Sequence, residues 1–192
     1  MRALRHEFEG EPEAGHRLLC GDSTDALVAE KVLKGIKPQM VFADPPYGMR
    51  LDADYSSEKS TLKMLRGKGL KGGRRYSNVI GDHADFDRGL IDSIFANFGA
   101  APEMFLWGAD YYSDLVPARN DGSWVVWDKR LDETADRMYG SCFELCSSRR
   151  RHKREMVRVK WAGVFGVEKE PDRRRWHPTQ KPVELVRWFI DR

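Results

Sequence analysis

Short apolar runs alternate along the chain with segments of helical spacing, a pattern typical of an α/β fold with a largely parallel sheet. The run at 39–43 is apolar at nearly every position, which predicts a strand buried on both faces of the sheet. A shorter run at 16–20 predicts a strand before it. Further strands are predicted at 104–107, 123–127, 141–146 and about 157–161.

Three segments have the apolar spacing of helices that cover a sheet. Ser23 or Thr24 can cap the first of them. Pro182 opens the last, because proline is tolerated at the first helical position. The helices are predicted at about 24–33, 86–98 and 183–190.

A glycine-rich and basic stretch at about 48–84 shows little periodicity. We interpret it as a long loop or small insertion that is mobile or faces DNA, since loops of this length are usually functional or mobile. The rest of the chain predicts a single domain over residues 1–192, without repeats or a low-complexity linker.

The composition excludes several broad classes of protein. Of the 192 residues, 33% are charged and 41% are hydrophobic, which is unlike a disordered tail or a membrane protein. No apolar stretch approaches the roughly 18 residues of a membrane span, and the start of the chain lacks the apolar core of a signal peptide. Three cysteines cannot all pair internally, so we expect a protein of the reducing cytoplasm.

Positive charge is concentrated in three segments, although the net charge is only +3. Residues 61–75 hold six bases and no acid, five of the six residues at 149–154 are basic, and 173–175 are all arginine. Any one cluster can be a solvated surface, but three together favour nucleic acid, because each phosphate contact releases a counterion. The candidate DNA contacts are Lys68, Lys71, Arg74, Arg75, Arg149, Arg150 and Arg151.

The tetrapeptide Asp44-Pro45-Pro46-Tyr47 follows the predicted strand 39–43, and open α/β sheets place ligands at the carboxyl ends of strands. A rigid turn would need the prolines but not Asp44 or Tyr47. An exocyclic amine on a base is a poor nucleophile, because its lone pair is delocalised into the ring. The Asp44 carboxylate and the Pro45 carbonyl can accept its two hydrogens, and Tyr47 offers a face on which the base stacks.

This tetrapeptide resembles the catalytic motif of amino-group DNA methyltransferases, which use S-adenosylmethionine. The aspartate form is typical of N6-adenine enzymes, whereas N4-cytosine enzymes more often have serine at the first position. A downstream hexapeptide, His177-Pro178-Thr179-Gln180-Lys181-Pro182, resembles the segment of the β-type subgroup that lies beside the methionine part of the cofactor. The two motifs occur in the order that this subgroup uses.

The resemblance implies a Rossmann-like class I methyltransferase sheet with helices on both faces. It also implies methyl transfer from S-adenosylmethionine to adenine N6 in double-stranded DNA, with the target base flipped out of the stack. The implied catalytic residues are Asp44, Pro45, Pro46 and Tyr47. The implied cofactor contacts are Asp22, Asp44, His177, Thr179 and Lys181, and no metal is implied.

In this subgroup a strand and a glycine-rich loop follow the second motif, and the chain stops at Asp191-Arg192 before either. We therefore expect a catalytic domain that is incomplete at its C-terminus and that alone binds S-adenosylmethionine weakly or not at all. An in-frame Asp-Pro-Phe-x-Gly-Ser-Gly segment encoded downstream would supply the loop.

Other interpretations of the sequence stay open. The acceptor can be cytosine N4 or an RNA adenine, or the chain can be a catalytically dead remnant that only binds DNA. Neither the target sequence, nor the oligomeric state, nor a role in a restriction-modification system can be read from the residues.

Two further groups of residues have competing interpretations. Cys142, Cys146 and His152 suggest zinc, but two cysteines four residues apart on a strand are ~13 Å apart, too far to share a metal. We interpret these cysteines as small apolar core residues. Tyr111 and Tyr112 follow a predicted strand and can line the base pocket or pack in the core.

Overall fold

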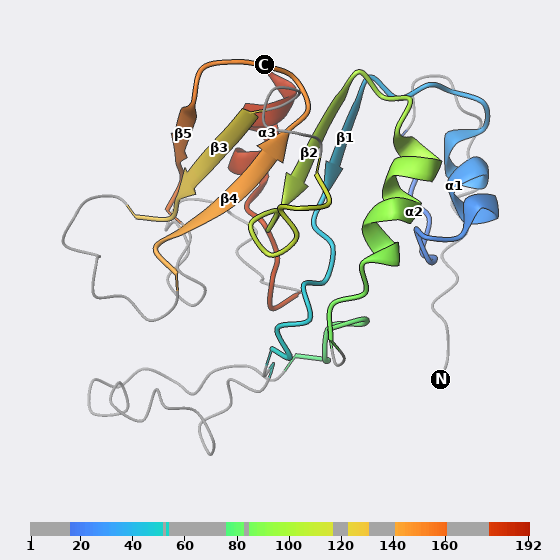
Figure 1. Cartoon of the computed structure of the whole chain (residues 1–192), viewed down its shortest axis with the longest axis horizontal. Helices are drawn as coiled ribbons and strands as arrows, with labels where there is room; N and C mark the ends of the chain where they lie inside the picture. The colour runs from blue at the N-terminus through green and yellow to red at the C-terminus, as the bar shows by residue number, and fades with distance from the viewer. Residues whose placement is uncertain are drawn as a thin grey trace.

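A computed structural model of the chain describes residues 16–51, 53, 76–82, 85–116, 123–130, 141–160 and 177–192. These residues form a mixed sheet and three helices, so the α/β class predicted from the sequence is confirmed (Figure 1). The elements in chain order are α1 (Ala26–Leu33), β1 (Met40–Ala43), α2 (Gly89–Phe98), β2 (Glu103–Trp107), β3 (Ser123–Asp128), β4 (Phe143–Ser148), β5 (Glu155–Arg158) and α3 (Val183–Ile190).

The described sheet has the strand order β1-β2-β4-β3-β5. β1 is parallel to β2 and β3 is parallel to β5, whereas β4 is antiparallel to both of its neighbours. Four strands therefore point the same way, but only two of the four pairings are parallel. The described sheet is mixed rather than largely parallel, because β4 lies antiparallel between β2 and β3. We call the edge at which these four strands end the carboxyl edge, and the opposite one the amino edge. Because β4 runs the other way, it begins at the carboxyl edge.

Helices cover both faces of the sheet, as predicted. Alternate residues of β2 point to opposite sides: Phe105 and Trp107 join the core beneath α3, and Met104 and Leu106 join the core beneath α2. From α3, the ring of Phe189 packs edge-on against Phe105 and Trp107, with centroids 4.5 and 5.5 Å away. The fold is thus a sheet between two helical layers.

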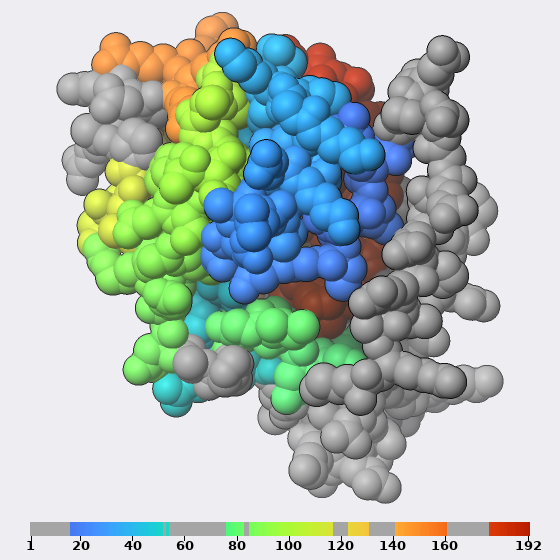
Figure 2. Space-filling model, turned by 90° about the vertical axis from the view of Figure 1, so that its right-hand side faces the viewer, coloured from blue at the N-terminus to red at the C-terminus, as the bar shows by residue number. Residues whose placement is uncertain are grey.

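Helix α1 lies beside α2. The side-chain amide of Asn97, in the last turn of α2, donates hydrogen bonds to the carbonyls of Ser23 and Thr24, just before α1. Figure 2 shows the blue segment around α1 next to the green segment around α2 on one side of the molecule. Within the described part of the chain, no helix is both long and apolar enough to span a membrane.

The predicted strand at 16–20 does not form. These residues take no part in the described sheet, and the Leu18 side chain is almost fully exposed. The guanidinium of Arg17 instead donates hydrogen bonds to the carbonyls of Val32 and Leu33 at the end of α1. An apolar run becomes a strand only where a neighbouring strand accepts its backbone hydrogen bonds, and in the described structure none is beside it.

Strand β1 forms, but the prediction that it is buried on both faces is wrong. All four residues of Met40–Ala43 are partly exposed. The reason is that β1 pairs only with β2 and lies at the end of the described sheet. Most of the predicted insertion at 48–84 lies outside the described residues.

The helix starts differ slightly from those predicted. The carboxylate of Asp25 caps α1 by accepting a hydrogen bond from the Leu27 N–H at 2.9 Å. Thr24 lies one residue before this cap, and its own N–H and hydroxyl both donate to the Asp22 carboxylate. Pro182 is the N-cap of α3, with extended backbone, rather than its first helical residue.

Packing of α3 on the sheet predicts a large difference between two substitutions in the same helix. Leu185→Ala removes a fully buried side chain and should destabilise the protein by about 2–5 kcal/mol. Val183→Ala, at a side chain that is 59% exposed, should change stability by less than about 0.5 kcal/mol. Chemical denaturation of the two variants measures the difference, and equal effects would contradict this packing.

Candidate active site at the carboxyl edge

Asp44 and Lys181 meet at the carboxyl edge, although 137 residues separate them in the chain. Asp44 directly follows β1, and Lys181 lies just before α3. The Lys181 ammonium donates a hydrogen bond to Asp44 Oδ2 at 2.8 Å, and the Tyr47 hydroxyl donates one to Asp44 Oδ1. Both motifs found in the sequence therefore contribute to one site, and both oxygens of the Asp44 carboxylate are engaged.

The Lys181 ammonium lies between two carboxylates and over two indole rings. It also donates to Glu144 Oε2 at 2.9 Å, and its Nζ is 5.0 Å from the ring centroid of Trp107 and 5.8 Å from that of Trp127. Its side chain is only 10% exposed. Burial alone would lower the pKa of Lys181, but the Asp44 and Glu144 carboxylates raise it above its ordinary value. Lys181 is therefore held as a cation.

Glu144 continues the row of charges across the sheet. Its other oxygen, Oε1, pairs with the ammonium of Lys129 at 2.5 Å. Burial would raise the pKa of Glu144, but Lys181 and Lys129 together lower it below its ordinary value. Asp44, Lys181, Glu144 and Lys129 form an alternating chain of ion pairs, which we call the ion-pair row. It runs along the carboxyl edge from β1 toward β3.

Tyr47 is enclosed by other aromatic side chains. Its ring is parallel to that of Tyr111, with a centroid distance of 5.2 Å and an interplanar angle of 5°, and the Tyr112 ring lies at 6.5 Å. Burial raises the pKa of Tyr47, and the Asp44 carboxylate raises it further. Tyr47 therefore stays a neutral phenol that donates to Asp44. The two tyrosines after β2 differ in burial. Tyr112 is fully buried and packs in the core, whereas Tyr111 is 53% exposed beside Tyr47.

Gly108 makes room for Tyr47. It follows β2 with φ +65°, and a Cβ there would lie 2.2 Å from Cζ of the Tyr47 ring. Both the positive φ and the close approach require glycine. Sequence reasoning missed this role; the signal was a glycine placed immediately after a predicted strand.

Asp82 fixes the chain that follows the tetrapeptide. It is 6% exposed, and its two oxygens accept hydrogen bonds from the N–H groups of Met49 and Leu51, both at 2.8 Å. The segment of Asp82 also packs against the motif, because a Cβ on Gly81 would lie 2.9 Å from Pro46 Cγ. No sequence motif marked Asp82, because its function depends on folding back over 33 residues.

The other candidate cofactor residues are exposed and form local turns. Nδ1 of His177 accepts from the Thr179 N–H at 3.3 Å and lies 3.0 Å from the Thr179 hydroxyl, so the ring organises the turn before Lys181. The Asp22 carboxylate accepts from the Thr24 hydroxyl and N–H, and these bonds lower its pKa. Among the contacts of the described residues, none joins Asp22 to Asp44.

The candidate DNA contacts at Arg149, Arg150 and Arg151 lie at the amino edge, away from Asp44, because β4 ends there. The Arg149 guanidinium donates to the carbonyls of Gly99 and Ala101, both at 2.6 Å, and so holds the segment between α2 and β2. Arg150 and Arg151 are exposed. The candidates Lys68, Lys71, Arg74 and Arg75 lie outside the described residues.

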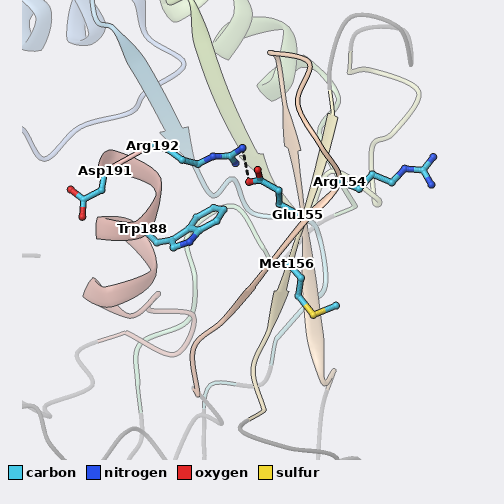
Figure 3. A pocket seen from close by; sticks show the side chains of 6 residues that line it. All are labelled: Arg154, Glu155, Met156, Trp188, Asp191 and Arg192. Atoms are coloured by element: carbon cyan, nitrogen blue, oxygen red, sulfur yellow. Dashed lines mark ion pairs between the residues drawn. The ribbon is translucent and has the colours of Figure 1, made fainter.

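An open pocket also lies at the amino edge, between the start of β5 and the end of α3 (Figure 3). The Trp188 ring forms one wall, and an ion pair of 2.5 Å joins Arg192 to Glu155 beside it. This pocket is therefore separate from Asp44. Its lining residues are Arg154, Glu155, Met156, Trp188, Asp191 and Arg192.

Of the residues weighed for zinc, Cys146 is fully buried and Cys142 is partly exposed. Burial raises the pKa of the Cys146 thiol well above its ordinary value. In the described ranges, no three His, Cys, Asp or Glu side chains are grouped so as to hold a metal ion.

Comparison of the chain with models of protein families, with curated proteins and with solved structures finds no match. The carboxyl edge combines a carboxylate at a strand end, a carbonyl between two prolines, a parallel aromatic stack and a buried cation.

The contact between Gly108 and Tyr47 predicts a site-specific effect of an added methyl group. Gly108→Ala should displace the Tyr47 ring and change the near-ultraviolet circular dichroism of the stacked tyrosines. Gly35→Ala is the matched control, since Gly35 also has positive φ but nothing lies within 4 Å of its added Cβ. The control should lower the free energy of unfolding by about 1–2 kcal/mol, the cost of a side chain at positive φ, and should leave the aromatic spectrum unchanged. Identical spectra for the two variants would contradict this role of Gly108.

The lowered pKa of Glu144 predicts a pH-dependent contribution to stability. A carboxyl whose folded pKa is depressed stabilises the protein above its unfolded pKa, and this stability is lost as the pH falls through the folded pKa. Glu144→Gln should therefore cost roughly 1–3 kcal/mol at neutral pH. The difference in Tm from the unsubstituted protein should shrink as the pH is lowered below about 4.3.

Glu30→Gln, at an exposed position in α1, serves as the control and should show no such convergence. Thermal unfolding of the three proteins across the acid range measures both effects. A Tm difference for Glu144→Gln that stays constant down to the lowest pH would refute the pairing.

Proposed function

We propose that the chain is a DNA methyltransferase domain, which transfers a methyl group from S-adenosylmethionine to the N6 amino group of adenine. The observation that carries this proposal is the 2.8 Å hydrogen bond between Lys181 and Asp44. The resemblance of the two motifs implies that one binds the target amine and the other the methionine part of the cofactor. Methyl transfer needs these two groups side by side, and the residues that would bind them are in contact.

Asp44 and Pro45 supply the two acceptors that the target amine needs. The carboxylate and the carbonyl hold its two hydrogens, so that the nitrogen lone pair is directed out of the plane of the base. The proline rings fix φ at both positions, which restricts the direction in which the Pro45 carbonyl points. Asp44 then takes the proton that the nitrogen loses as it gains the methyl carbon.

Lys181 and Thr179 fit the carboxylate of a bound S-adenosylmethionine. An ammonium has three N–H donors, and Asp44 and Glu144 accept two from Lys181, so one is left for a carboxylate. Thr179 is an exposed residue two positions away, and its hydroxyl lies 3.0 Å from His177 Nδ1. When bound, S-adenosylmethionine would supply the electrophilic methyl group and leave as S-adenosylhomocysteine once its sulfur–methyl bond breaks; the protein would supply charge and orientation.

The described arrangement is a closed form of the site. The target amine must replace either the Tyr47 hydroxyl or the Lys181 ammonium on Asp44, and Glu144 keeps Lys181 paired when it leaves. The parallel ring of Tyr111 covers Tyr47 where the base would stack, and its half-exposed position allows it to move aside. Stacking of the base on Tyr47 would contribute ~1–3 kcal/mol.

A second candidate function is DNA binding without catalysis. The observation that favours it is the complete occupation of the Asp44 carboxylate by Tyr47 and Lys181. If these bonds do not open, the carboxyl edge is a structural ion-pair row. The two candidates differ in a single product, which the following experiment measures.

Purified protein is incubated with duplex DNA and millimolar S-adenosylmethionine, and methylated nucleosides are quantified by mass spectrometry. The millimolar cofactor allows for the weak binding expected from the sequence, so the unsubstituted chain should form N6-methyladenine slowly. Asp44→Ala should lower this rate by at least about 10²-fold, the scale of a lost acid–base and orienting group. Asp110→Ala, at an exposed carboxylate beside Tyr111, should leave the rate unchanged.

Three results would contradict the proposal. Equal product from the unsubstituted chain and Asp44→Ala would remove Asp44 from the chemistry. Formation of N4-methylcytosine alone would change the acceptor. DNA binding without any methylated base would favour the second candidate.

A further inference from the structure

A second group of charges lies at the carboxyl edge, where β3 and β5 end. Asp128 is 2% exposed, and its carboxylate accepts hydrogen bonds from the guanidinium of Arg130 at 2.8 Å and from that of Arg158 at 3.1 Å. Asp128 and Arg158 are register partners in the parallel pair β3 and β5, which brings their side chains together. One carboxylate thus holds two arginines, and the group has an excess positive charge.

Asp128 is a permanent anchor for these arginines. The hydrogen bonds from Arg130, together with that from Arg158, outweigh burial and lower the pKa of Asp128 to about 2. The anchor stays ionised throughout the neutral range. Its bonds to Arg130 are local, because the two residues are only two positions apart. The backbone N–H of Arg130 also donates to Asp128 Oδ1, at 3.0 Å.

Among the described cations along this edge of β3, β4 and β5, Arg158 is the most exposed. Its side chain is 54% exposed, compared with 24% for Arg130, 17% for Lys129 and 10% for Lys181. Val157 and Val159 on either side of it are buried in the core beneath α3, so Arg158 extends from the opposite face of β5. Asp128 engages Nε, which leaves the two terminal amino groups at the end of an oriented fork.

We propose that Arg158, held in place by Asp128, contacts a backbone phosphate of the nucleic acid whose base enters the Asp44 site. An oriented guanidinium fork matches the two oxygens of a phosphate. This inference rests on the proposed function, since it takes DNA as the substrate. It assigns the phosphate contact to a residue that did not belong to any of the basic clusters in the sequence.

The position of Arg158 suits a long substrate better than that of Arg149, Arg150 and Arg151. Arg158 is on the same edge as Asp44, four strand spacings away, or about 19 Å at ~4.8 Å per strand. At ~3.4 Å per nucleotide along a duplex, this distance corresponds to roughly five or six base pairs. The three arginines at the end of β4 lie on the opposite edge.

The test measures binding of a fluorescein-labelled duplex at a series of salt concentrations, by fluorescence anisotropy. Arg158→Gln should weaken binding several-fold and reduce the slope of log affinity against log salt by about 0.9, the value for one lost phosphate contact. Arg158→Lys keeps the charge and should keep the slope. Lys37→Gln removes an exposed charge just before β1, at the amino edge and outside the basic clusters, and should leave slope and affinity unchanged.

Several outcomes would overturn the inference: no measurable duplex binding by the unsubstituted chain, an unchanged slope for Arg158→Gln, or equal losses for Arg158→Gln and Lys37→Gln. Circular dichroism of Arg158→Gln checks that the fold persists, since Arg130 still pairs with Asp128 in that variant. If Arg158→Gln changes the salt slope but no methylated base forms, the phosphate contact stands and the methyltransferase proposal fails. If methylated adenine forms and the slope is unchanged, the methyltransferase proposal stands and the phosphate contact fails.

Discussion

The ammonium of Lys181, enclosed between two carboxylates, is the interaction on which the carboxyl edge depends. An unpaired ammonium that is only 10% exposed would be strongly unfavourable, and removing one partner of a buried pair typically costs about 3–5 kcal/mol. Its hydrogen bonds to Asp44 and Glu144 satisfy that charge. They also tie the segment before α3 to the ends of two strands that are not neighbours in the sheet.

The same contacts that stabilise the site close it. Tyr47 lies between the turn at Gly108 and the ring of Tyr111, and its hydroxyl is bonded to Asp44. A substrate of the proposed activity would therefore have to exchange bonds with these groups. In such an exchange Glu144 would still pair with Lys181 after the bond between Lys181 and Asp44 had opened.

The direction of β4 determines which charges belong to the site. Since β4 is antiparallel to its neighbours, its first residues lie at the carboxyl edge and its last residues at the amino edge. Glu144 is thereby brought to Lys181, and Arg149 is carried away to hold the segment between α2 and β2. Parallel pairing of β3 with β5 has the opposite effect on Arg158, which it places beside Asp128.

The sequence by itself determined the α/β class, the positions of most strands and helices, and the two motifs that contribute Asp44 and Lys181. These features depend on local periodicity and on residue order, which a linear chain carries in full. It did not determine that residues 16–20 lack a partner, that β1 is partly exposed, or that Glu144, Lys129, Gly108 and Asp82 shape the site. Those outcomes depend on strand order, strand direction and contacts between segments far apart in the chain. Only tertiary packing decides them. The role of a charged residue, or of a glycine, depends on which distant segments pack against it.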